Sequence, residues 1–232
     1  MSFNTQHCQN FLTKKIDFDV MAEAIRTCDA DVIGLQEMRD KGENYYYQEQ
    51  ARILAEKLGY YYYFAEAIRF DGVNPYGNAL LSRYPIKAVH TEMIPDPVSP
   101  AYGGYYETRC VLVAELDVPG GLRVCVSHFG LNPDEQENAV NTVLPLLRDT
   151  RCVLMGDLNV LPDDPLLEPI QKRMNDTAEA FDAEKFSYPS DNPTSKLDYI
   201  FTSPDLSVLD ADIPPIVAAD HRPHTATVYL GD

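Results

Sequence analysis

Residues 152–160, Cys-Val-Leu-Met-Gly-Asp-Leu-Asn-Val, form an apolar run that ends in polar side chains. The four residues before Gly156 resemble a strand buried on both faces of a sheet. Gly156 lets the backbone pass close to a neighbouring strand or a ligand. Asp157 and Asn159 are two residues apart, so on an extended segment both would point to the same side. The stretch therefore predicts a buried strand that presents a carboxylate and a carboxamide to one pocket.

A strand followed by an Asx-rich turn would show the same pattern, so this stretch alone leaves both interpretations open. A functional site is favoured because other apolar runs also end in polar groups. A carboxylate after such a run is costly to bury unless a partner offsets its desolvation. Individually, Glu37 could be an edge glutamate facing water, and His128 could be structural. The polar ends of the other runs are Asn4, Glu37, His128, Asp198, and Asp220 with His221.

The chain has 232 residues, and 45% of them are hydrophobic. This length suits one large sandwich or barrel with a sizeable core. No internal repeat, linker or low-complexity segment interrupts it. We therefore expect a single domain over residues 1–232, of mixed α/β (α+β) class.

Helical spacing of apolar residues predicts helices over 18–28, 44–58, 132–147 and 164–174. Short apolar or alternating runs predict strands over 1–4, 32–37, 60–64, 78–86, 88–94, 106–116, 122–129, 152–160, 196–201, 208–213 and 225–230. Pro119-Gly120-Gly121 predicts a hairpin turn. Loops are expected over 72–77 and over 95–104, the second at the mouth of the site.

The formal charge is −17, from 19 Lys and Arg against 36 Asp and Glu. Such a surface repels polyanions over a Debye length. A binder of duplex DNA normally carries a basic stripe, and none is visible. A large nucleic acid is therefore an unlikely partner, whereas a small phosphate ester remains compatible with the charge.

The five cysteines are odd in number and widely spaced, and none forms a CxxC pair, so free thiols are expected. No apolar run reaches the roughly 18 residues that a membrane span needs, and no signal peptide opens the sequence. We expect a cytoplasmic monomer, or a secreted protein if an upstream signal has been removed.

Together the polar ends supply carboxylates, carboxamides and imidazoles but no soft ligand set. Hard oxygen ligands suit Mg²⁺, with Mn²⁺ as a possible substitute. An Asp beside a His, with another buried Asp available, suits an oriented acid–base pair. The sequence contains no nucleophile elbow and no glycine-rich phosphate loop.

The order of these segments resembles the endonuclease/exonuclease/phosphatase superfamily of metal-dependent hydrolases, which includes deoxyribonuclease I, apurinic endonucleases, neutral sphingomyelinases and inositol-polyphosphate 5-phosphatases. Each motif alone is weak, but all of them in order are specific. The resemblance implies a four-layered α/β sandwich, with two mixed β-sheets face to face and helices outside. The matching motifs are Ser-Phe-Asn4, Gly-Leu-Gln-Glu37, Gly-Asn78-Ala-Leu-Leu-Ser-Arg83-Tyr-Pro-Ile, Ser-His128, Gly-Asp157-Leu-Asn159, Leu-Asp198-Tyr-Ile-Phe and Asp220-His221-Arg-Pro.

The resemblance also implies roles for single residues. Glu37 resembles the principal metal ligand, with Asn4 and Asp220 close by. Asp157 resembles the group that orients or deprotonates the attacking water. The groups that resemble phosphoryl-binding residues are Asn159 and His128, and Asp198 with His221 resembles the carboxylate–imidazole pair at the scissile phosphate. The alternative for that pair is that Asp198 accepts from backbone amides while His221 caps a loop.

The sequence departs from the family pattern at two places. Ala219 stands before Asp220, where the family more often has Ser, so one hydroxyl contact is expected to be lost. The strand leading to Asn4 is very short, and its end of the sheet is expected to fray.

The expected activity is Mg²⁺-dependent hydrolysis of a small or exposed phosphodiester or phosphomonoester, without a covalent intermediate. A nuclease acting on DNA or RNA is the alternative, although nuclease members tend to bring basic loops. A catalytically silent binding module is a third hypothesis, and the retention of every motif argues against it.

Overall fold

The computed structural model describes residues 1–231 and contains two mixed β-sheets. β1 and β2 pair in parallel in the first sheet, as do β7 and β8 in the second, and the other neighbours are antiparallel. The first sheet consists, in spatial order, of β1 (Ser2–Asn4), β2 (Val32–Arg39), β4 (Asn74–Ser82) and β3 (Tyr61–Phe70). The second consists of β5 (Ile86–Met93), β6 (Cys110–Leu116), β7 (Leu122–His128), β8 (Cys152–Asp157), β10 (Asp198–Thr202) and β9 (Asn175–Asp176). A separate ribbon pairs β11 (Ser207–Asp212) with β12 (Thr225–Tyr229).

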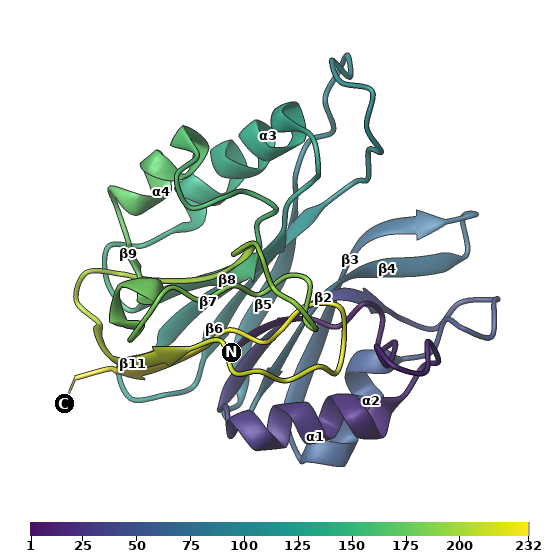
Figure 1. The fold of residues 1–232 in the computed structure, drawn as a ribbon, viewed down its shortest axis with the longest axis horizontal. Coiled ribbons are helices and arrows are strands. Elements are labelled where there is room, and N and C mark those ends of the chain that lie inside the picture. Colours follow the sequence, from purple (N-terminus) through teal and green to yellow (C-terminus); the bar gives the residue numbers. More distant parts are fainter. Residues whose placement is uncertain (232) are drawn as a thin grey trace.

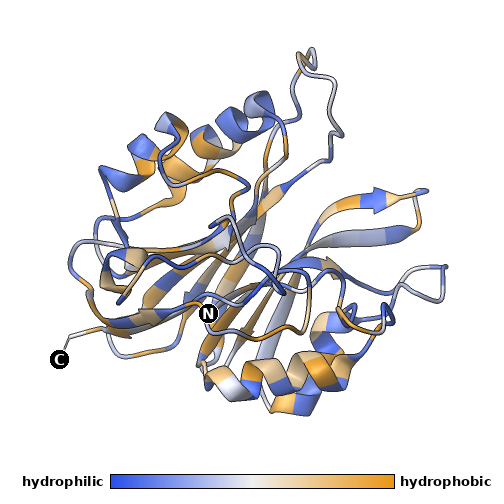
Figure 2. Ribbon diagram, viewed as in Figure 1, coloured by the Kyte–Doolittle hydropathy of each residue, from blue (hydrophilic) through white to orange (hydrophobic). Residues whose placement is uncertain are grey.

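Helices cover the outer face of each sheet (Figure 1). α1 (Phe18–Cys28) and α2 (Gln50–Leu58) pack on the four-stranded sheet. α3 (Pro133–Val143) and α4 (Glu168–Gln171) pack on the six-stranded sheet. Figure 2 shows apolar residues alternating with hydrophilic ones along these helices, as amphipathic helices require. The predicted four-layered sandwich is confirmed.

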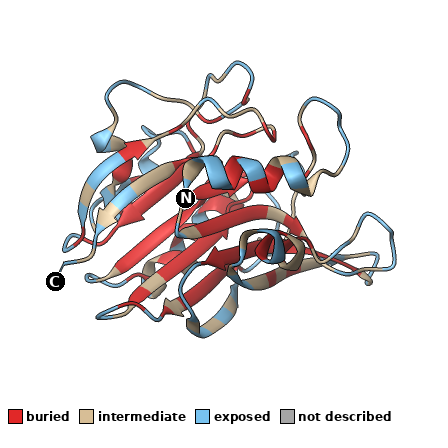
Figure 3. Ribbon diagram, turned by 90° about the horizontal axis from the view of Figure 1, so that it is seen from below, coloured by how far each residue is buried: buried red, intermediate tan, exposed pale blue. Residues whose placement is uncertain are grey.

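Three apolar layers hold the sandwich together, and the alternation of side chains along each strand explains them. In β7, Val124 and Val126 point between the sheets, whereas Cys125 points toward α3. β8 repeats the pattern, with Val153 and Met155 inside and Leu154 outside. β7 and β8 are therefore buried on both faces, and Figure 3 shows buried residues running along the central strands. Burial on both faces is why the sequence of these strands is almost continuously apolar.

Several predicted boundaries were wrong. The helix expected over 44–58 begins only at Gln50, because Asn44 closes a turn by accepting hydrogen bonds from Tyr46 N (3.0 Å) and Tyr47 N (2.8 Å). The loop expected over 72–77 is shorter, since β4 begins at Asn74 after a turn in which Asp71 is left-handed (φ 54°).

Prolines shorten two other predicted helices. The helix expected over 132–147 ends at Val143 and continues only as a 3₁₀ turn, Leu144–Leu146. The helix expected over 164–174 is split into a 3₁₀ turn, Pro165–Leu167, and the four-residue α4. A proline has no N–H to donate to the preceding turn. The predicted loop over 95–104 is present and is tied to α3, where Asp134 accepts from Ala101 N (3.1 Å).

β1 is as short as predicted, but the expected fraying is not found. Phe3 is fully buried, and the Met1 amino group donates to Val32 O (2.9 Å). Ser2 exchanges two backbone hydrogen bonds with His224, at 2.8 and 2.9 Å. A strand of three residues is thus held on both sides by segments distant in the sequence. Within residues 1–231, no helix is both long enough and apolar enough to cross a membrane.

The close approach of β7 and β8 depends on Gly156. A Cβ atom there would lie 2.0 Å from the backbone oxygen of Ser127, which cannot rotate away. We expect Gly156→Ala to lower the free energy of unfolding by about 1–3 kcal/mol, as overpacking does. Urea denaturation measures this loss, and Gly103→Ala is the control because a Cβ there meets no atom within 4 Å. Equal stability of the two variants would contradict the close approach.

Candidate active site

Strand register places the predicted polar groups at one end of the sandwich. His128 at the end of β7 is in register with Asp157 at the end of β8. Asp157 is also in register with Asp198, which begins the antiparallel strand β10. A polar group at the start of an antiparallel strand therefore joins those at the ends of its neighbours. All three side chains are buried.

Asn4 links the two sheets across this end of the molecule. Its side-chain nitrogen donates to Glu37 Oε1 (3.1 Å) on the first sheet and to Asp157 Oδ2 (3.0 Å) on the second. Its Oδ1 accepts a hydrogen bond from Gln6 N (3.0 Å). Asn4 is fully buried, so its amide has little freedom to turn. In this orientation it holds two carboxylates, and metal ligation by Oδ1 would require the amide to rotate.

His221 lies between two buried carboxylates. Its Nδ1 is 2.8 Å from Asp198 Oδ2, and its Nε2 is 3.6 Å from Asp157 Oδ2. Burial alone would lower the pKa of His221, but the charges of Asp198 and Asp157 raise it to about 10. The ring is therefore an imidazolium at neutral pH. The ring of Tyr188 packs against it, with the centroids 4.8 Å apart.

Asp157 approaches both histidines: its Oδ2 lies 3.6 Å from His221 Nε2 and 3.6 Å from His128 Nε2. Burial raises its pKa, His221 lowers it and Asp198 raises it, and the balance lies at about 7. Its Oδ1 accepts from Asn159 N (3.1 Å) in a tight turn. Asn159 is left-handed (φ 51°) rather than extended, so the prediction that Asp157 and Asn159 share one strand face was wrong. The strand has already ended at Asp157, and the period of two does not continue past it.

Asn159 nevertheless lies beside His128, with its Nδ2 3.2 Å from His128 Nε2 and 3.1 Å from Phe129 O. On the other side of the ring, Arg109 Nη1 is 3.0 Å from His128 Nδ1. Arginine can only donate, so Nδ1 accepts and the proton of the neutral ring sits on Nε2. Burial and the charge of Arg109 lower the pKa of His128 well below its ordinary value. With the proton on Nε2, His128 Nε2 and Asn159 Nδ2 are both donors, so they do not hydrogen-bond each other and an acceptor placed beside them could receive from both.

Sequence reasoning missed Arg109 and its partner Glu107, whose Oε1 is 2.5 Å from Arg109 Nη1. It considered only polar groups that follow apolar runs, whereas Arg109 precedes one. The predicted hairpin turn at residues 119–121 contained the missing signal, because an antiparallel hairpin places the start of β6 beside the end of β7. It also missed His7, whose Nδ1 is 3.8 Å from Glu37 Oε2.

Glu37 sits in a β-bulge between β2 and β4, with a left-handed backbone (φ 61°). Bulges commonly redirect a side chain next to an active site. Burial raises the pKa of Glu37, but the contacts with His7 and the hydrogen bond from Asn4 lower it, to about 2. Glu37 is therefore ionised across the whole physiological range.

Asp220 completes the group of carboxylates. Burial raises its pKa, His221 lowers it, and the charge of Glu37 raises it further. Among residues 1–231, its Oδ1 is one of the buried side-chain oxygens without a hydrogen-bond partner. Two carboxylates that repel each other, one of them with an unpaired oxygen, fit a hard divalent cation between them. Asp157, Asp198 and His221 also offer ligand atoms within 4.8 Å of one another, although His221 and Asp198 already bind each other.

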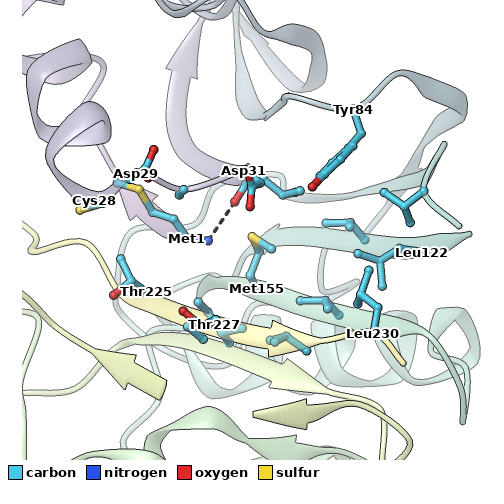
Figure 4. A pocket seen from close by; sticks show the side chains of 18 of the residues that line it. Met1, Cys28, Asp29, Asp31, Tyr84, Leu122, Met155, Thr225, Thr227 and Leu230 are labelled. Atoms are coloured by element: carbon cyan, nitrogen blue, oxygen red, sulfur yellow. Dashed lines mark hydrogen bonds between the residues drawn. The ribbon is translucent and has the colours of Figure 1, made fainter. Parts of the chain in front are cut away.

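A separate hollow of about 340 Å³ contains none of the predicted site residues. Figure 4 shows its lining, with apolar side chains such as Met155, Leu122 and Leu230 and with Asp29 and Asp31 to one side. The described residues that line it include three aspartates, Asp29, Asp31 and Asp210, but no histidine.

The raised pKa of His221 makes stability depend on pH. An unfolded histidine titrates near 6.5, so the stabilisation is complete below pH 6.5 and is lost as pH rises through about 10. We expect the free energy of unfolding, measured with urea in EDTA, to fall by about 2–4 kcal/mol over this range relative to His221→Gln. His90→Gln, which alters an exposed histidine, serves as the control. Parallel curves for wild type and His221→Gln would exclude the charged pairing.

Comparison with known proteins identifies the family. The model of the "Endonuclease/Exonuclease/phosphatase family" matches residues 1–221, and all three activities in this description break phosphoester bonds. The comparison with curated proteins gives no match.

Among solved structures, an endonuclease/exonuclease/phosphatase from Beutenbergia cavernae is 20% identical, with a TM-score of 0.77 over 99% of this chain and 70% of that one. A family protein from Leptotrichia buccalis is 19% identical, with a TM-score of 0.75 over 98% of both chains. A mannosyl-6-phosphatase from Bacteroides thetaiotaomicron is 18% identical, with a TM-score of 0.72 over 91% of this chain and 90% of that one. At these identities the structures establish the shared fold. On the strength of the family match over nearly its whole length, this chain belongs to the endonuclease/exonuclease/phosphatase family.

Proposed function

We propose that the protein hydrolyses a phosphoester bond by metal-assisted attack of water on phosphorus. The observation that carries the proposal is the placement of His221 between Asp157 and Asp198, with the carboxylates of Glu37 and Asp220 beside it. These groups come from both sheets and from both ends of the chain. Bringing these charged groups together costs folding free energy, and groups perturbed in this way tend to cluster at functional sites.

Glu37 and Asp220 are the residues that would hold the cation, with Asn4 orienting Glu37 through its amide. A bound Mg²⁺ or Mn²⁺ polarises a phosphoryl oxygen and neutralises charge on the leaving oxygen. The unpaired Oδ1 of Asp220 supports this assignment. The Asp157–Asp198–His221 cluster is a less suitable place, because its imidazolium would have to lose a proton before binding a cation.

Asp157 would orient the attacking water and accept its proton. A pKa of about 7 allows it to be ionised in part of the molecules at neutral pH and to take up a proton readily. Asn4 Nδ2 fixes one of its oxygens and Asn159 N fixes the other, which limits its rotation. A fixed acceptor lowers the entropic cost of reaching the reactive geometry.

His128 Nε2 and the Asn159 amide would donate to the phosphoryl oxygens. Arg109 supports them by fixing the tautomer of His128. His221, held by Asp198, carries its remaining proton on Nε2 and would place it at the scissile phosphate or its leaving oxygen. Each role uses a group already oriented by a neighbour.

A small phosphoester is the favoured substrate class. The charge of −17 disfavours a long polyanion, and one structure of the same fold is described as a mannosyl-6-phosphatase. A nuclease is the alternative, since the family description includes nucleases. A silent binding module would not need the buried, paired acid–base groups.

A panel of phosphoesters tests the proposal: bis-aryl phosphodiesters, sugar phosphates, phospholipid head groups, RNA and plasmid DNA, each with Mg²⁺ or Mn²⁺. We expect hydrolysis of small esters that is abolished by EDTA, and weaker Mg²⁺ binding by Glu37→Gln in calorimetry, because the variant loses one charge facing the cation. Glu168→Gln is the matched control, as its side chain is exposed and pairs with Lys172. Full activity after thorough chelation would rule out the metal, and preferential cleavage of nucleic acids would establish the nuclease alternative.

Asp198 and His221 are expected to act as one unit. Asp198→Ala and His221→Ala should each lower kcat by about 10²–10⁴-fold, the range for a positioned acid–base group. The double variant should lose little more than the worse single variant, because each residue works through the other. Rates are measured at saturating Mg²⁺, with folding checked by circular dichroism. If the two losses multiply, the groups act independently and the pairing has no catalytic role.

A further inference from the structure

Most basic side chains of this acidic protein are paired with carboxylates. Within residues 1–231, the Lys and Arg side chains that make no ion pair with Asp or Glu are Lys14, Lys15, Arg39, Lys41, Arg151 and Arg222. Two of these guanidinium groups bind backbone carbonyls: Arg151 donates to Gly121 O (2.7 Å) and Arg222 to Ser190 O (2.7 Å). The cations that remain available are therefore concentrated in the loop after β1, at the end of β2 and in the loop that follows β2.

Three of them line one groove of about 450 Å³, which we name the basic groove. It lies between the loop that follows β1 and the loop that joins β2 to α2, and both loops extend from the same end of the first sheet (Figure 1). Among the described residues, no carboxylate lines it. Its lining consists of His7, Gln9, Lys14, Lys15, Ile16, Arg39, Tyr45, Tyr46 and Gln48.

The groove is held in shape by buried amides. Gln50, which is fully buried, accepts from Arg39 N (2.8 Å) and donates to His7 O (2.8 Å), so one side chain joins the two loops. In the first loop, Asn10 Oδ1 accepts from Leu12 N (2.9 Å), and Asn10 N donates to Lys15 O (2.9 Å). The lysines therefore sit on an ordered turn, which reduces the entropy lost when a ligand binds.

Arg39 carries a donor without an acceptor. Its Nε is buried and has no hydrogen-bond partner among residues 1–231, and its guanidinium lies 4.8 Å from the centroid of the Tyr47 ring. A planar guanidinium with free donors matches the oxygens of a phosphate. The ammonium of Lys14, 4.0 Å from the centroid of the Phe11 ring, is likewise free of any carboxylate.

The basic groove adjoins the proposed reaction centre. His7 lines the groove and also approaches Glu37, with 3.8 Å between Nδ1 and Oε2. Arg39 follows Glu37 by two residues in β2. The hollow in Figure 4, by contrast, has an apolar floor and lies beside Asp29 and Asp31, which would repel an anion. An anion would therefore bind the basic groove, on the side of the molecule where the phosphoester would react, rather than the hollow.

We propose that the basic groove binds a second phosphate group of the substrate, so that the preferred substrates are small bisphosphates rather than monophosphates. This inference rests on the proposed function. Lys14, Lys15 and Arg39 contact the second phosphate while the first reacts beside Glu37. The rings of Tyr45 and Tyr46, both exposed and 3.9 Å apart, flank the sugar or base between the two phosphates.

Two pairs of probes test this: fructose 6-phosphate against fructose 1,6-bisphosphate, and AMP against adenosine 3′,5′-bisphosphate. Values of kcat/KM are measured with Mg²⁺, and dissociation constants are measured by calorimetry on Asp157→Asn, which lacks the proposed base. We expect at least one bisphosphate to be favoured by tenfold or more in both quantities, since each charge-assisted contact is worth about tenfold. The pair of probes in which the bisphosphate is preferred shows whether a sugar or a nucleoside joins the two phosphates of the substrate.

The double variant Lys14→Gln/Lys15→Gln should reduce that preference to about threefold or less and leave the monophosphate unchanged. Lys172→Gln, an exposed lysine on α4's C-terminal side, is the matched control and should retain the full preference. Raising the salt concentration from 50 to 500 mM should also weaken the preference, because the contacts are charged and partly exposed.

The two proposals fail in different ways. Hydrolysis of monophosphates with no preference for either bisphosphate overturns the basic groove and leaves the function intact. A tenfold preference in binding that depends on Lys14 and Lys15, without any turnover, supports the groove and overturns the hydrolase. If Lys14→Gln/Lys15→Gln retains the full preference for the bisphosphate, the second phosphate binds elsewhere and the basic groove is not its site.

Discussion

The mutual repulsion of buried carboxylates is the constraint on which the rest of the structure depends. Asp157 and Asp198 are buried, and the charges of Glu37 and Asp220, both half-buried, act on each other beside them. Charges in such an environment repel strongly, because little solvent screens them. His221 neutralises part of this charge from inside, and the Asn4 amide donates to two of the carboxylates. What remains is a net negative site, which a divalent cation would complete.

The sandwich is the framework that makes this concentration of charge possible. Three apolar layers fix two sheets face to face, so groups at their ends cannot move apart to relieve repulsion. The strain is local: Glu37 adopts a left-handed backbone conformation, which is unfavourable for glutamate, whereas the left-handed Asn159 is a residue type that tolerates it. The apolar core thus stabilises the fold, and the strain and repulsion at the site lower that stability.

The pattern of residues was enough to find the polar groups at strand ends and a mixed α/β class, whereas the four-layered arrangement came from the family resemblance. Glu37, Asp157 and Asp198 stand out because each interrupts or ends an apolar run, and burial on both faces makes those runs long. It was not enough to find Arg109, because only polar groups that follow apolar runs were considered and Arg109 precedes one. Asn159 was assigned the wrong geometry because a period of two applies only while the strand lasts. The basic groove was hidden because a total charge of −17 says nothing of where the unpaired cations gather, and because the tyrosines beside it had been assigned to a helix.

The pairing of Ser2 with His224 has a consequence for synthesis of the chain. Asn4 and His221, which belong to the same reaction centre, are each within three residues of one partner in that pairing. A nascent polypeptide that has emerged as far as β10 already has most of both sheets, yet it lacks the imidazole that its buried acids require. The candidate site is therefore incomplete in a nascent chain until residues 221–224 have emerged and the segment around His224 has paired with β1.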